Sequence, residues 1–133
     1  MQTPVQISFH GLDSSEAVET RIREKIAKLE QFFDRITAGR VVVERHHSSS
    51  SHLSTKDQPF HISIVLEVPG EELVVKRDPK SDASLKDHQD VNIALRDAFA
   101  VMQRQLKEYV ARRRRDRQLA ERAARNEPNL QAE

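Results

Sequence analysis

The sequence predicts an α+β fold, in which two helices pack on one face of a four-stranded mixed sheet in the order β-α-β-β-β-α. Three observations support this prediction. Two long segments repeat apolar residues every three or four positions, four short segments are rich in apolar residues at strand spacing, and turn-forming residues separate several of them. Because each predicted strand has one clearly apolar face, the simplest arrangement places both helices on the same face of one sheet.

A strand and a helix open the chain. Gly11 ends the strand, and we expect Asp13 to cap the helix that follows, with Glu16 as the second half of a capping box. The helix should span about twenty residues and end before Gly39. The apolar residues of the strand are Val5, Ile7 and Phe9, and those of the helix are Val18, Ile22, Ile26, Leu29 and Phe33.

Three further strands are predicted in the middle of the chain. The second strand is Arg40–Arg45, and the third, Phe60–Val68, shows the clearest alternation of apolar and polar residues. Pro69-Gly70 then turns the chain into a fourth strand over residues 72–76. A strand-helix-strand start favours a parallel first pair with a right-handed crossover, and the next two connections favour antiparallel hairpins.

The second helix carries the longest apolar repeat, and Asp90 is positioned to cap it. The next position on its apolar stripe is Arg113, so packing against a core must stop at about that residue. The anchored helix therefore continues into a cationic arm that begins with four consecutive arginines, Arg112–Arg115. The stripe itself consists of Val91, Leu95, Phe99, Met102, Leu106 and Val110.

The chain of 133 residues is long enough for one domain with a core. We expect this domain to span residues 1–115. We expect residues 116–133 to form a charged, flexible tail that is helical only when bound. The serine-rich segment His46–Gln58 is predicted to be disordered, and Asp78–Gln89 is predicted to be a loop.

Composition excludes several classes of protein. Cysteine is absent, which excludes a disulfide scaffold and a thiolate zinc site and favours a cytoplasmic location. We see no signal peptide and no apolar run that could span a bilayer, so we expect no membrane partner. The three glycines form no phosphate-cradling loop, and His46, His47 and His52 lack helical metal-ligand spacing. We therefore predict no catalytic residue, cofactor, metal or small-molecule substrate, and a chain that is not an enzyme.

The positive charge is concentrated although the net charge is only +1. Cations gather on one flank of the first helix and along the end of the second, where few acids accompany them. Without interleaved aromatic residues, this pattern suits contact with phosphates and recognition of RNA shape more than stacking on bases. Ordinary solvated helix surfaces would give a similar pattern. The predicted RNA-binding residues are Arg21, Lys25, Lys28, Arg35, Arg104, Lys107, Arg112, Arg113, Arg114 and Arg115.

Three motifs resemble the ribosome hibernation promoting factor family, which includes the ribosome-associated translation inhibitors. They are the run Lys25–Ile36, the aspartate-led segment Asp90–Asp97, and Arg104-Gln105-Leu106, and the resemblance spans Val5 to Arg115. The resemblance implies a non-enzymatic factor that occupies the mRNA and tRNA channel of the small ribosomal subunit. Such a factor inhibits translation and promotes ribosome hibernation under stress. By position, Lys25, Lys28, Arg104, Arg112 and Arg114 match basic residues of the family, and the first three match residues that face ribosomal RNA.

This sequence departs from the family pattern in places. Glu108 and Val110 stand where short members often carry lysine, and no room remains after Arg117 for the dimerisation domain of the long members, so we expect a short or divergent member. An alternative is a protein-interaction module that uses an exposed sheet edge and the helical tail. A general binder of double-stranded RNA is a third reading. Self-association and any part in ribosome dimerisation stay open.

Overall fold

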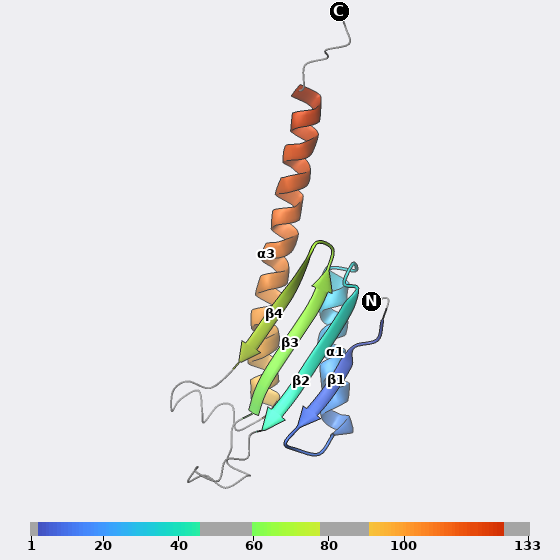
Figure 1. The fold of residues 1–133 in the computed structure, drawn as a ribbon, viewed down its shortest axis with the longest axis vertical. Coiled ribbons are helices and arrows are strands. Elements are labelled where there is room, and N and C mark those ends of the chain that lie inside the picture. The colour runs from blue at the N-terminus through green and yellow to red at the C-terminus, as the bar shows by residue number, and fades with distance from the viewer. Residues whose placement is uncertain (1–2, 46–59, 78–90, 127–133) are drawn as a thin grey trace, which may run out of the picture.

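The computed structural model describes residues 3–45, 60–77 and 91–126, which form one sheet and two helices. The strands stand in the order β1-β2-β3-β4, and both helices cover the same face of the sheet (Figure 1). The elements are β1 (Gln6–His10), α1 (Glu16–Phe32), β2 (Ala38–Arg45), β3 (Phe60–Val68), β4 (Glu71–Arg77) and α3 (Val91–Asn126). The predicted fold class, element order and single helical layer are confirmed.

The pairing of the strands also agrees with the prediction. β1 runs parallel to β2, and β3 is antiparallel to both β2 and β4. Val41, Ile64 and Val75 are opposite one another across the three longer strands and are all buried beneath the helices. Gly70 has φ +86° in the turn between β3 and β4, a left-handed conformation that glycine adopts without steric cost.

The predicted cap of α1 is wrong. Ser15, not Asp13, is the N-cap, because its backbone is extended and its side-chain oxygen accepts the Val18 N–H at 3.3 Å. Glu16 is therefore the first residue of the helix and is not the partner in a capping box. Glu16 and Glu19 occupy the first turn, where negative charge favours the helix dipole. Asp90, the predicted cap of α3, lies outside the described residues.

A single apolar core lies between the sheet and the helices. α1 contributes Ile22, Ile26 and Leu29, and α3 contributes one side of its first half. Tyr109 belongs to this core and is 2% exposed, whereas the predicted stripe residue Val110 is only partly buried. The remaining core residues are Ile36, Val41, Val43, Phe60, Ile62, Ile64, Leu66, Val68, Leu73, Val75, Ala94, Leu95, Ala98, Phe99, Met102 and Leu106.

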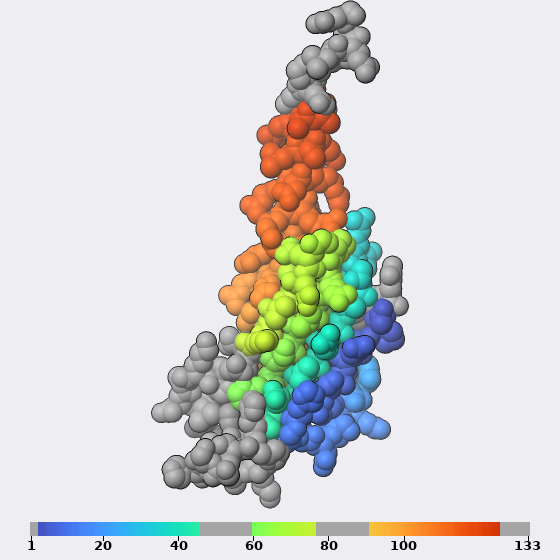
Figure 2. Space-filling view, in the orientation of Figure 1, coloured from blue at the N-terminus to red at the C-terminus, as the bar shows by residue number. Residues whose placement is uncertain are grey.

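α3 continues well past the core. Its second half projects beyond the end of the sheet and carries no other element on it in this view (Figure 2). Packing stops near Arg113, as predicted, and the helix continues to Asn126. That residues 116–133 are a flexible tail that becomes helical on binding stays a prediction. The predicted loops His46–Gln58 and Asp78–Gln89 lie outside the described residues. Among the helices that are described, none combines the length and apolarity needed to span a membrane.

Candidate nucleic-acid interface

α1 and α3 lie side by side and run in the same direction on the surface that faces away from the sheet (Figure 1). The Lys25 Nζ lies 6.0 Å from the centroid of the Phe99 ring. About two turns further along both helices, the Lys107 Nζ lies 6.0 Å from the centroid of the Phe32 ring. Cations from each helix thus reach across the seam onto aromatic rings of the other helix.

Four cations meet at the middle of the seam, and we call them the seam cluster: Arg21, Lys25 and Lys28 of α1 and Arg96 of α3. Partial burial lowers the pKa of Lys25, and the positive charges of Lys28, Arg21 and Arg96 lower it further, in that order. The nearby Glu24 opposes this shift. Arg21, Lys25 and Lys28, three of the predicted cations, are therefore close enough for their positive charges to repel.

Arg104 and Lys107 continue the positive surface along α3. Both side chains are exposed, and each lies about one turn from the exposed Ala100 or Ala111 on the same side of the helix. This side faces away from Leu106 and Met102, which are buried against the sheet. Lys28 and Arg104 are exposed and Lys25 is partly buried, so all three are accessible from outside the helical layer. That they form one RNA-binding surface stays a prediction.

A second group of cations surrounds a shallow cleft of about 410 Å³ where α1 ends beside α3. We call it the arginine cleft, and its basic residues are Arg35, Arg113, Arg114 and Arg117. Phe32, Phe33, Gln31, Asp34 and Val110 complete its lining. Among the residues that the structure describes, no carboxylate forms an ion pair with Arg35, Arg114 or Arg117.

Arg113 and Arg112 are held by the turn between β3 and β4. The Arg113 Nη1 donates to the Tyr109 hydroxyl at 2.8 Å and to the Pro69 carbonyl oxygen at 3.3 Å. The Tyr109 hydroxyl in turn donates to the same carbonyl oxygen at 2.6 Å. Arg112 forms an ion pair with Glu71 at 3.1 Å. Two of the four consecutive arginines therefore fasten α3 to this turn, and Arg114 and Arg115 are exposed.

The structure adds three residues that the predicted set did not include. Arg96 joins the seam cluster, and Arg117 and Phe32 line the arginine cleft. Helical spacing places Arg96 eleven residues, or about three turns, before the predicted cation Lys107 on the same side of the helix, so that signal was available in the sequence. The sequence carried no signal for Phe32, because this residue belongs to α1 and lies beside the cations of α3 only in the folded protein.

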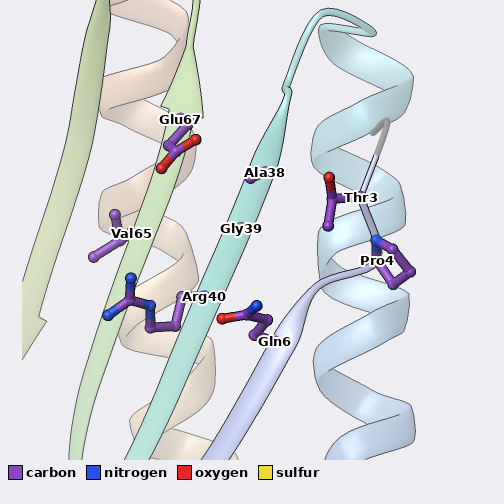
Figure 3. A pocket seen from close by; sticks show the side chains of 8 residues that line it. All are labelled: Thr3, Pro4, Gln6, Ala38, Gly39, Arg40, Val65 and Glu67. Atoms are coloured by element: carbon purple, nitrogen blue, oxygen red, sulfur yellow. The ribbon is translucent and has the colours of Figure 1, made fainter.

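The opposite face of the sheet lacks this concentration of positive charge. One hollow of this face, near the starts of β1 and β2, has a volume of about 150 Å³, below the usual range of ligand pockets (Figure 3). Arg40 and Gln6 lie near one another there, and Glu67 stands further along β3 (Figure 3). Another hollow of about 400 Å³ lies beside His10, His61 and Lys76. Within the described ranges, no group of three or more His, Asp or Glu side chains is placed to hold a metal ion. His46, His47 and His52 lie outside those ranges.

Comparisons with known proteins agree with this fold. A ribosomal subunit interface protein from Coxiella burnetii has a similar structure, with a TM-score of 0.59 and 15% identity over 80% of this chain and 97% of that chain. The N-terminal domain of Protein Y from Thermus thermophilus is also similar, with a TM-score of 0.57 and 18% identity over 80% of this chain and 99% of that chain. At these identities the likeness establishes the fold alone.

Sequence comparison identifies the family. No curated protein matched the chain. The profile of the family described as sigma 54 modulation protein / S30EA ribosomal protein matches residues 5–114, which is most of the chain. This is the family that the three sequence motifs resemble. The chain therefore belongs to the sigma 54 modulation protein / S30EA ribosomal protein family.

Proposed function

We propose that the chain is a non-enzymatic ribosome-binding factor that contacts the ribosomal RNA of the small subunit through the outer surface of α1 and α3. The observation that carries this proposal is the seam cluster, in which lysines and arginines of two helices converge without an equal number of carboxylates. Membership of the S30EA family and the resemblance to a ribosomal subunit interface protein support the choice of partner.

The distribution of charge favours a structured polyanion. Cations extend along both helices from the seam cluster to the arginine cleft, a larger span than a small anion would need. Arginine side chains can bind two phosphate oxygens at once, which suits an RNA surface with closely spaced phosphates. Partner binding should release counterions, and the affinity should therefore fall steeply as salt rises.

We further propose that binding occupies the mRNA and tRNA channel of the small subunit, inhibits translation and promotes ribosome hibernation under stress. This part rests on the resemblance of Lys25–Ile36 and Arg104-Gln105-Leu106 to the hibernation factors. The site of action would then be the cytoplasm. Displacement of bound tRNA from small subunits by the chain is the direct measurement of this step.

Cosedimentation with purified small subunits at low and high salt tests the RNA surface. We expect the double variant Lys28→Glu/Arg104→Glu to lose most of its binding. The matched control is Arg40→Glu/Lys76→Glu, which makes the same change in charge on the opposite, exposed face of the sheet. If the two double variants bind equally well, the assignment of the outer helical surface is wrong.

The alternative of a protein-interaction module finds less support in the structure. The Gln105 Nε2 donates to the Val74 carbonyl oxygen at 3.2 Å, so α3 already covers part of the outer strand β4. The projecting part of α3 exposes a single large apolar residue, Leu119, among many charges. Capture of a protein partner that survives nuclease treatment, together with no binding to small subunits, would favour the alternative.

A further inference from the structure

Phe32 and Phe33 are neighbours in sequence but occupy different environments. Phe33 packs edge-to-face on the core residue Tyr109, with ring centroids 5.5 Å apart. Phe32, the last residue of α1, is 45% exposed and lines the arginine cleft. The Lys107 Nζ lies 6.0 Å from the centroid of its ring, at the outer limit of a cation–π contact. The core accounts for Phe33, but it does not account for an aromatic ring at position 32.

In the arginine cleft beside this ring, the positive charge of the arginines exceeds the negative charge that the protein places next to them. The C-terminal end of α1 presents about half an elementary negative charge. Arg35, Arg114 and Arg117 bring three positive charges, while Asp34 is the sole acid among the lining residues. Arg113 also lines the cleft but already donates to Pro69 and Tyr109. About one and a half positive charges thus remain for an anion from outside.

We propose that the arginine cleft binds one unpaired nucleotide of RNA, with its base stacked on Phe32 and its phosphates held by Arg35, Arg114 and Arg117. This inference rests on the proposed function and names a second, base-contacting site on the same RNA. An aromatic ring beside guanidinium groups is the arrangement with which proteins bind single-stranded nucleic acid. The volume of about 410 Å³ lies within the range of sites for small ligands.

The geometry favours an unpaired nucleotide over a base pair. A paired base in an A-form helix hides its face in the stack, whereas bases of loops and bulges can be splayed out onto an aromatic side chain. Lys107 covers the Phe32 ring only at long range, so a base can take its place while the ammonium group moves toward a phosphate. The seam cluster would contact the backbone, and the cleft would select an unpaired position.

Phe32→Trp provides a local probe, because the natural sequence contains no tryptophan. The full chain carrying this substitution is titrated with a single-stranded RNA decamer and with a duplex of the same sequence. We expect the decamer to quench the tryptophan fluorescence at concentrations about tenfold lower than the duplex. Adding Arg117→Gln should raise the concentration of decamer that is needed. The proposal would be overturned if the decamer caused no quenching or if the duplex quenched as strongly as the decamer. Quenching by a free nucleoside triphosphate but not by the decamer would also overturn it.

Binding to small ribosomal subunits gives the second measurement. Phe32→Leu keeps an apolar side chain but removes the aromatic face, and it should weaken binding about tenfold, whereas Phe32→Tyr should bind like the natural chain. Thermal unfolding checks that both variants fold, as expected for an exposed position. If the natural chain does not bind subunits, the proposed function fails and the decamer titration still decides the nucleotide site. If it binds and Phe32→Leu binds equally well, only the nucleotide site fails.

Discussion

The two halves of α3 form one continuous helix but are stabilised in different ways. The packed half, residues 91–113, buries one side against the sheet and ends with the hydrogen bonds of Tyr109 and Arg113 to Pro69. In the projecting half, residues 114–126, every residue from 114 to 125 is exposed. This half depends on residues with high helix propensity, chiefly arginine, alanine, leucine and glutamine. A short helix of this kind is marginal alone, so the packed half must serve as its nucleus.

The four consecutive arginines Arg112–Arg115 have two different roles, because they lie where the packed half meets the projecting half. Arg112 and Arg113 are bound to Glu71, Tyr109 and Pro69, and they hold the helix in place. Arg114 lies in the arginine cleft, and Arg115 is exposed. Charge density along the sequence therefore overstates the charge that is available to a partner. The anchored pair fixes the direction in which the projecting half leaves the domain.

The largest expected effect is on the free energy of unfolding, when a leucine of each half of α3 is replaced by alanine. Leu106 is 0% exposed and Leu119 is 60% exposed. Leu106→Ala should lower the free energy of unfolding by about 2–5 kcal/mol because it leaves a cavity in the core. Leu119→Ala should change it by less than about 0.5 kcal/mol. Urea unfolding measures both values, and a comparable loss at Leu119 would mean that the projecting half packs against something.

The salt dependence of RNA binding should distinguish the two halves next. Each phosphate contact that is lost should reduce the slope of log affinity against log salt by about one. We therefore expect Arg114→Gln/Arg117→Gln to reduce the slope by about two, and Arg112→Gln, whose partner is Glu71, to reduce it by clearly less. Binding to small subunits at several salt concentrations gives the slopes. Equal slopes for the two variants would contradict the division between anchored and available arginines.

Much of the fold could be predicted because its signals are local. The alternation in Phe60–Val68 and the stripe from Leu95 to Leu106 each depend on neighbours a few positions away, and both predictions are confirmed. The cap of α1 was wrong because Asp13, Ser14 and Ser15 all suit an N-cap chemically. Which of them caps depends on where the chain leaves β1, and this is set by packing.

The candidate site was less predictable because its contacts join distant segments. Arg113 meets Pro69, and Phe32 meets Lys107, only when α3 packs beside the hairpin and α1. A helical wheel gives the direction of each side chain on its own helix but does not show what lies opposite. The hydrogen bonds of Arg113 and the exposure of Phe32 are therefore properties that the sequence pattern could not supply.

A smaller effect is expected at the junction of the two halves. Tyr109→Phe keeps the buried ring but removes the hydroxyl that donates to Pro69 and accepts from Arg113. The loss should be about 1–2 kcal/mol in the free energy of unfolding. Arg113→Gln combined with Tyr109→Phe should cost less than the sum of the single variants, because the two side chains share one network. Urea unfolding of the three variants measures this coupling, and strict additivity would contradict it.

The smallest expected effect is the pH dependence that Lys25, beside the packed half of α3, gives to the free energy of unfolding. Burial and the nearby charges of Lys28, Arg21 and Arg96 place the pKa of Lys25 in the folded state below its ordinary 10.5. As pH rises through this lowered pKa, the folded state releases the proton before the unfolded state does. The unfolded state then binds more protons, and the contribution of Lys25 to the free energy of unfolding rises with pH up to about 10.5.

Unfolding measured over this alkaline range in the natural chain and in Lys25→Gln isolates that contribution from those of the other lysines. As pH rises, the free energy of unfolding of the natural chain should increase relative to that of Lys25→Gln. Lys28→Gln should make the shift smaller, because it removes the largest repulsive charge near Lys25. A difference that stays constant with pH would mean that the cations of α1 and α3 do not crowd Lys25. The positive surface on the packed half would then be more dispersed than its geometry indicates.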